Sequence, residues 1–178
     1  MISQGTIVAI ATPSGAGALG IIRLSGPEAR QILAPYFKAK SGKKLLDLAP
    51  KETAFGTLQQ EDGRLLDEVL LCCFNAPNSF TGENVVELSC HGSSYILQEV
   101  VQLCLRNGAV PAQAGEFTLR AFLNKKMDLS QAEAVADLIA SDSKAAHTVA
   151  LQQMRGGYSK EIQELRQELL NFASLLAL

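Results

Sequence analysis

The hydrophobic pattern of this chain changes its period near Gly115, and this change constrains the fold more than any other feature. Before Gly115, short runs rich in β-branched residues are separated by turns with glycine, proline or asparagine, as is typical of strands. From Gly115 onward, apolar residues recur at the three- and four-residue spacing of helices. We therefore predict an α+β domain with a mixed sheet over residues 1–117. Over residues 118–178 we predict the first part of an all-α helical bundle domain.

The first domain is predicted to follow the order β-β-α-β-β-β-α-β, with helices packed on the sheet. Its predicted strands are 5–11, 19–24, 53–60, 65–74, 84–90 and 109–113. The first helix is expected to begin at Ser25, because Ser25 and Glu28 have the spacing of a capping box, and to run to about Phe37. The second helix is expected after Gly92. An Asp-Gly step between the third and fourth strands predicts a hairpin.

The second domain is predicted to begin with a long alanine-rich helix, which starts at a capping box over Ser130–Glu133 and breaks at Gly156-Gly157. The last helix carries a heptad-like apolar seam. The seam consists of Ile162, Leu165, Leu169, Phe172 and Leu176. The chain stops at Leu178 in an apolar helix without glycine, proline or a basic last turn, so we expect a truncated protein.

Composition and charge exclude several classes of protein. The 178 residues are 47% hydrophobic, which suffices for one core of ordinary size and a smaller second element. A net charge of −2 provides no global basic field for nucleic acid, although a local basic face stays open. The apolar runs are too short for a membrane span, and the first residues lack the features of a signal peptide. We expect a soluble, cytoplasmic protein.

The cysteines show no metal-binding spacing. They are Cys72, Cys73, Cys90 and Cys104. A zinc site using Cys90 and His91 is conceivable, but buried free thiols in a reducing compartment account better for the pattern. We therefore predict no metal site.

Two glycine motifs bear on nucleotide binding. Gly15–Gly20 matches the G-x-G-x-x-G of dinucleotide sites, but the following residues are strand-like where a helix should begin. A flexible turn between two strands is favoured, and a loop that a ligand or second subunit approaches closely stays open. No G-x-x-x-x-G-K-[ST] motif occurs, so we expect no nucleotide hydrolysis by that mechanism. No Ser/His/Asp set can be assembled, and we predict no catalytic residue in this chain.

Three charged residues are candidates for a binding site. Arg23 and Glu87 interrupt otherwise apolar strands, where a charge is costly unless it is paired or bound to a ligand. A lone charge in a strand is more often an edge-strand charge or part of a structural ion pair than a ligand contact. Lys126 lies in a loop between two predicted helices. It is either solvated or neutralises an anionic ligand tail or a tRNA phosphate.

Six ordered segments together resemble the tRNA-modification GTPase family called MnmE or TrmE. The segments are Thr6–Pro13, Gly20–Gly26, Pro77–Glu83, Glu87–Gly92, Gly115–Asn124 and Lys126–Ala134. The resemblance extends over essentially the whole chain. It implies that the first domain is similar to the tetrahydrofolate-binding domain of the glycine-cleavage aminomethyltransferase. It also implies a Ras-like GTPase domain, inserted in the helical domain and absent from this chain.

The resemblance also implies a function. With an FAD-binding partner, MnmG, the family uses GTP, magnesium and potassium to modify C5 of the wobble uridine in certain tRNAs. The one-carbon unit comes from 5-formyltetrahydrofolate or a related folate. The first domain is implied to form a homodimer and to bind the folate, whose contacts fall by position on Arg23, Glu87 and Lys126. The family's C-terminal Cys-x-Gly-Lys tail, whose lysine reaches the folate, is absent here, so we expect an incomplete site.

Two hypotheses follow. The leading one is a folate-binding, dimerising module that binds but does not catalyse. The second is a purely structural dimerisation module in which folate is irrelevant; the apolar seam after Gly157 and the lack of a catalytic set favour it. An aminomethyltransferase-type enzyme would need a catalytic aspartate that cannot be placed in this sequence.

Overall fold

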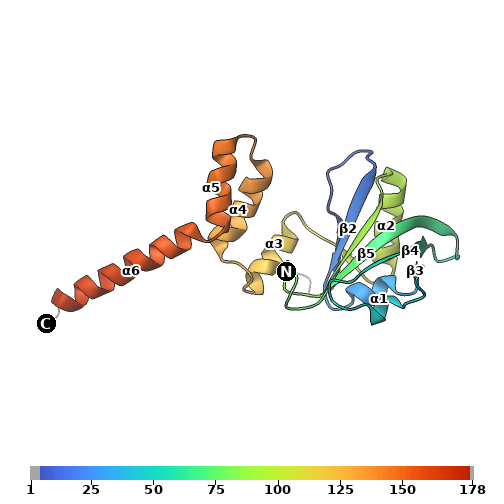
Figure 1. Ribbon diagram of the computed structural model, residues 1–178, viewed down its shortest axis with the longest axis horizontal. Helices are drawn as coiled ribbons and strands as arrows, with labels where there is room; N and C mark the ends of the chain where they lie inside the picture. The colour runs from blue at the N-terminus through green and yellow to red at the C-terminus, as the bar shows by residue number, and fades with distance from the viewer. Residues whose placement is uncertain (1–4, 177–178) are drawn as a thin grey trace. The chain divides into compact units, whose positions relative to one another are not determined.

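The computed structural model describes residues 5–176, with the side chains of residues 158, 160, 175 and 176 excepted. It divides into two compact units, residues 1–120 and 121–178, each considered separately below (Figure 1). In order, the strands and helices up to β7 are β1 (Ile7–Ile10), β2 (Leu19–Ser25), α1 (Ala29–Leu33), β3 (Phe37–Ala39), β4 (Thr53–Gln59), β5 (Leu65–Phe74), β6 (Val85–His91), α2 (Ser94–Arg106) and β7 (Val110–Pro111). The helices that follow are α3 (Glu116–Leu123), α4 (Leu129–Ala140), α5 (Lys144–Met154) and α6 (Gly157–Leu176).

The first unit is built on one seven-stranded sheet with the order β3-β4-β5-β6-β2-β1-β7. Neighbouring strands are antiparallel except for the parallel pair β1 and β7, so the predicted mixed sheet is confirmed. Its central strands are long because they are rich in branched apolar residues, which fit a pleated surface. The predicted Asp-Gly hairpin is also confirmed, because Gly63 at its tip has φ +83° and joins β4 to β5.

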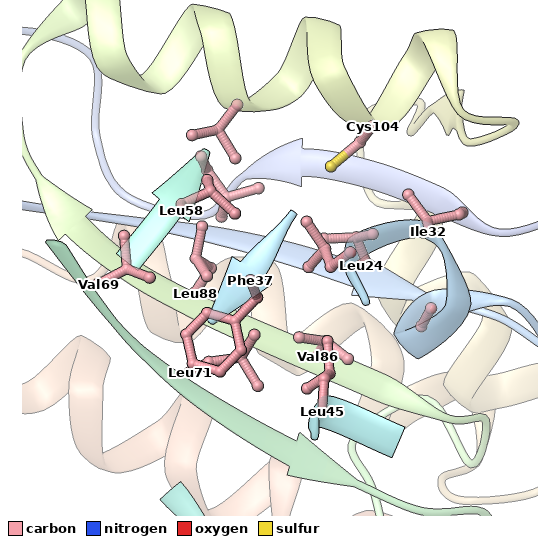
Figure 2. Close-up of a cluster of buried hydrophobic side chains, with 14 of the residues drawn as sticks. Leu24, Ile32, Phe37, Leu45, Leu58, Val69, Leu71, Val86, Leu88 and Cys104 are labelled. Carbon is pink, nitrogen blue, oxygen red and sulfur yellow. The ribbon is translucent and has the colours of Figure 1, made fainter. Parts of the chain in front are cut away.

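The hydrophobic core lies on one face of this sheet. Ile22, Leu88 and Leu71 are cross-strand neighbours on β2, β6 and β5, and all three side chains are completely buried. Figure 2 shows Ile32 of α1 and Cys104 of α2 in the same cluster as the sheet leucines. Each fully buried leucine or isoleucine stabilises the fold by roughly 1.5–3 kcal/mol relative to leaving it exposed. Because strand side chains alternate between faces, residues 23, 72 and 87 point away from this core.

The predicted first helix is wrong at both ends. α1 ends at Leu33 because Pro35 follows and cannot continue a helix, and Phe37 instead opens the additional short strand β3. Ser25 does not cap α1. It is the last residue of β2, and its hydroxyl donates to Glu83 Oε2 at 2.6 Å. Glu83 lies in the loop before β6, and a hydrogen bond to its charged carboxylate is stronger than one to a neutral helix amide, so the capping box with Glu28 does not form.

The second unit is helical in all its described residues except the turns, as predicted. The capping box, however, lies two residues before the predicted one. Asp128 accepts a hydrogen bond from the Gln131 backbone at 2.9 Å, and the Gln131 side chain accepts one from the Asp128 backbone. The predicted long helix is also interrupted, because Ser143 caps a separate helix, α5, by accepting from the Ala146 N–H.

The predicted apolar seam lies on α6. Ile162, Leu165, Leu169 and Phe172 are each more than half exposed within the described residues. The fifth seam position, Leu176, and the chain end at Leu178 fall outside the described side chains.

Candidate functional site

Arg23 and Glu87 form an ion pair on the sheet face opposite the core. They are direct cross-strand partners on β2 and β6. Arg23 Nε donates to Glu87 Oε1 at 2.8 Å, and Arg23 Nη2 lies 2.7 Å from the same oxygen. The side chains are 27% and 29% exposed, respectively. Both charges are therefore semi-buried and paired with each other, which is one of the two arrangements that the sequence left open.

Two aromatic rings flank the Arg23 guanidinium. Its Cζ lies 5.6 Å from the centroid of Phe80, in the loop between β5 and β6, and 5.5 Å from the centroid of Phe117 on α3. Both distances fall within the range of a cation–π interaction, which strengthens as the cation loses water. The ion pair thus lies in an aromatic setting, with Phe80 itself 40% exposed.

The pair keeps unused hydrogen-bonding capacity. Its contacts employ Glu87 Oε1 and the Nε and Nη2 atoms of Arg23. Among the described residues, neither Glu87 Oε2 nor Arg23 Nη1 makes a hydrogen bond. An acceptor oxygen and a charged donor nitrogen of the same ion pair are therefore available. Together they can serve a ligand that offers both an N–H and a carbonyl or ring nitrogen.

Cys72 is the next cross-strand neighbour after Arg23 and Glu87 on this sheet face. It lies opposite Glu87 on β5 and is partly exposed, whereas Cys73, its neighbour in sequence, is fully buried on the core face. Burial, together with the Glu87 carboxylate, raises the pKa of the Cys72 thiol. All four cysteines are free, and the described residues contain no cluster of side chains suited to a metal ion. Cys72 is therefore a free thiol that lines the same sheet face as Arg23 and Glu87.

The third predicted residue, Lys126, belongs to the second unit. It lies in the turn between α3 and α4, where its backbone N–H donates to Ala121 O at 2.9 Å. The preceding residue, Lys125, has φ +58°, which turns the chain sharply there. The side chain of Lys126 is exposed and lines a hollow of about 560 Å³ with neighbouring residues of the same unit. The structure thus joins Arg23 and Glu87 in one contact and places Lys126 in a separate unit.

Phe80, Phe117 and Cys72 were missed as site residues in the sequence. Phe80 and Phe117 stand inside two of the segments that carry the family resemblance, Pro77–Glu83 and Gly115–Asn124. A phenylalanine in a loop or an amphipathic helix is ordinarily a packing residue, so nothing in its local pattern marks it. The fold of the loop before β6 brings Phe80 to Arg23, and the position of α3 brings Phe117 there.

The glycine-rich loop at residues 11–18 and the side chain of His91 make structural contacts. Residues 11–18 join antiparallel strands β1 and β2, and no helix follows, so the dinucleotide interpretation is excluded as expected. Gly17 N–H donates to Gly92 O at 3.1 Å, and a Cβ on Gly92 would lie only 2.5 Å from Gly17 O. His91 Nδ1 lies 2.7 Å from Asp67 Oδ1. This contact fixes the end of β6 against β5.

Comparisons with known proteins identify the family. The family described as "GTP-binding protein TrmE N-terminus" matches residues 6–126, and "MnmE helical domain" matches residues 129–178. The chain belongs to the MnmE (TrmE) family. The resemblance that the six sequence segments carry is therefore confirmed.

Relatives called "tRNA modification GTPase MnmE" match along nearly the whole chain. The protein of Christiangramia forsetii is 62% identical over 97% of this chain. Those of Flavobacterium johnsoniae and Bacteroides fragilis are each 58% identical, over 100% and 99% of the chain. The chain spans only 36–38% of the length of these MnmE relatives. Among the helices described for this MnmE chain, none is long and apolar enough to cross a membrane.

Proposed function

We propose that this chain is the folate-binding and dimerising part of a tRNA-modification GTPase. Arg23 and Glu87 recognise the pteridine ring of 5-formyltetrahydrofolate or a related folate, and Lys126 supplies a third contact to the same ligand. The whole protein acts in the cytoplasm with the FAD-binding partner MnmG on C5 of the wobble uridine of tRNA. GTP, magnesium and potassium bind in a GTPase domain outside these residues.

The available pair of Glu87 Oε2 and Arg23 Nη1 supports this proposal most directly. The aminopyrimidinone edge of a pteridine presents an N–H next to a carbonyl, so it can donate to Glu87 and accept from Arg23 at once. Because Glu87 Oε1 already accepts from Arg23, the ligand uses the second carboxylate oxygen. Phe80 and Phe117 then border the ring's flat faces or edges, where aromatic contacts are favourable.

Calorimetric titration of 5-formyltetrahydrofolate into the intact chain tests the proposal. We expect saturable binding that Glu87→Ala abolishes, because the variant removes the acceptor for the pteridine N–H. Glu68→Ala is the matched control, since Glu68 is also a carboxylate on this sheet but pairs with Lys40 instead. p-Aminobenzoylglutamate, which lacks the pteridine, should bind no more tightly to the unchanged protein than to Glu87→Ala. A folded chain that gives no heat at millimolar ligand would contradict the proposal.

A purely structural dimerisation module is the second candidate. It is supported by Phe55 and Leu70, cross-strand neighbours that are 48% and 45% exposed on the sheet face that also carries Arg23. Sedimentation equilibrium separates the candidates. A dimer that forms without folate, together with no heat in the titration, favours the structural module. Folate binding that depends on Glu87 favours the first proposal.

A further inference from the structure

Arg120 is a buried cation that the proposed site does not use directly. Its side chain is 4% exposed and lies one helical turn after Glu116 on α3. Nη2 and Nε donate to Glu116 Oε1 at 3.0 and 3.3 Å. Nη1 donates to Gly5 O at 3.0 Å and to the two Glu83 oxygens at 3.1 and 3.2 Å. One guanidinium therefore joins the helix, the N-terminal segment and the loop before β6.

Glu83 extends this network to β2. The hydroxyl of Ser25 donates to Glu83 Oε2 at 2.6 Å and lies 2.7 Å from Thr81 Oγ1. Thr81 Oγ1 also accepts a hydrogen bond from the Glu83 N–H at 3.3 Å, so two residues of the loop between β5 and β6 bind each other. Buried polar networks of this kind are rigid when all members are satisfied, because every displaced group loses partners in a low-dielectric setting.

Each end of the network lies next to one component of the Arg23 site. Ser25 is two residues after Arg23 on the same face of β2, Thr81 directly follows Phe80, and Glu116 directly precedes Phe117. The network thus fixes three separate segments at the residues adjacent to the guanidinium and its two flanking rings. Two family segments, Pro77–Glu83 and Gly115–Asn124, supply most of its members.

We propose that Arg120 is a positioning residue that holds Phe80 and Phe117 against Arg23 and so prepares the pteridine site. The inference rests on the proposed folate function. Arg120 acts through the rings and does not itself contact the ligand. Without the hydrogen bonds of Arg120, the loop and the short helix could move and carry each ring away from the guanidinium. A single cation–π contact is too weak at a partly exposed site to prevent this movement.

Arg120→Lys is the informative substitution. It keeps the charge between Glu83 and Glu116, so that neither carboxylate is buried without a cation, but it lacks the planar fork that reaches both carboxylates and Gly5 O together. Val69→Ala is the control, because Val69 is buried on the opposite sheet face. It lowers stability without touching the network. Thermal unfolding of both variants sets a temperature at which each is folded.

Folate affinity gives the first readout. We expect Arg120→Lys to weaken 5-formyltetrahydrofolate binding about tenfold, and Val69→Ala to leave it within about twofold. In a Phe117→Leu background the Arg120→Lys penalty should shrink, since the ring through which Arg120 acts is gone. Equal losses in the two single variants, or a penalty unchanged by Phe117→Leu, would overturn the positioning role.

Arg23 reactivity gives a second readout that needs no folate. Modification by phenylglyoxal, located by mass spectrometry, reports how well the rings shield the guanidinium. We expect Arg120→Lys to accelerate modification of Arg23 and Val69→Ala to leave it unchanged. If the unchanged protein binds no folate, the proposed function fails on its own, and this measurement alone decides the role of Arg120. No acceleration of Arg23 modification overturns that role.

Discussion

At the scale of single residues, the sheet face opposite the core is organised as a cross-strand row. Arg23, Glu87 and Cys72 follow one another on β2, β6 and β5. Charges in the interior of strands were predicted to need partners, and the register supplies the partner directly. The sequence could not show the flanking rings, because Phe80 and Phe117 are distant from Arg23 along the chain and are typical packing residues.

Removal of the Glu87 charge should make Cys72 more reactive. The carboxylate disfavours the neighbouring thiolate and so contributes to the raised pKa of Cys72. In Glu87→Gln that pKa falls, the thiolate fraction near about pH 8 rises, and alkylation by iodoacetamide accelerates by about threefold. Peptide mass spectrometry over time measures the rate at Cys72.

Glu68→Gln is the control for this reactivity, since it removes a carboxylate elsewhere on β5. Cys73 and Cys90, whose burial raises their pKa values to about 11, should stay slow in every folded variant. A Cys72 rate that responds equally to both substitutions would show that Glu87 has no specific influence on the thiol.

At the scale of elements, the sequence predicted most strands and helices because their apolar period is strong. β4, β5, β6 and α2 formed close to the predicted residues. The failures occurred where two local signals compete. Ser25 has the spacing of a cap but is held by Glu83, and Ser130 has a capping pattern that Asp128 and Gln131 supply two residues earlier. Which partner wins depends on contacts that a one-dimensional pattern does not contain.

The cap of α4 can be tested by two substitutions. Asp128→Ala should lower the free energy of unfolding of the second unit by about 1 kcal/mol, whereas Ser130→Ala should change it by less than about 0.5 kcal/mol. The hydrogen bonds from Ser159 and from the Gln131 backbone lower the pKa of Asp128 below 3.8. The stability from Asp128 is therefore fully present above that value and is lost as the pH falls through the lower, folded pKa.

Urea unfolding at several pH values, followed by far-ultraviolet circular dichroism, measures the contribution of this cap. The difference between the unchanged chain and Asp128→Ala should disappear at low pH. A larger loss in the free energy of unfolding for Ser130→Ala than for Asp128→Ala would instead support the capping box over Ser130–Glu133 that was predicted from the sequence.

The hairpin tip between β4 and β5 gives a second test at this scale. Gly63 has φ +83°, and an added Cβ would meet no atom within 4 Å, so Gly63→Ala strains the backbone without any clash. We expect a loss of about 1 kcal/mol in the free energy of unfolding. Gly17→Ala is the control, since its nearest neighbour, Leu19 O, would lie at an ordinary 3.6 Å and its φ is not in the left-handed region. An equal cost at both positions, measured by chemical denaturation, would show that backbone conformation is not the cause.

At the scale of the whole molecule, the two units differ in what stabilises them. The first unit contains the large buried core of leucine, isoleucine and valine side chains. In the described part of the second unit, the completely or nearly buried apolar residues are Ala121, Ala134 and Ala150, which remove little apolar surface from water. Helix capping and contacts between α4 and α5 carry more of the stability there. The change of hydrophobic period at Gly115 predicted a strand-rich part followed by a helical part. That the two parts differ in the size of their hydrophobic core was seen only in the structure.

The second unit should therefore unfold before the first. Because the buried apolar side chains described in this unit are all alanines, its helices open at lower temperature or denaturant concentration than the sheet. Hydrogen exchange with mass spectrometry resolves the two unfolding transitions, since peptides from α4 and α5 report on one unit and peptides from β5 and β6 on the other.

Leu71→Ala, in the sheet core, should lower the free energy of the later transition by about 2–5 kcal/mol while leaving exchange in α4 unchanged. Ala150→Gly, in the middle of α5, should lower only the earlier transition, by about 1 kcal/mol. A single transition that both substitutions shift together would mean that the two units unfold as one cooperative body.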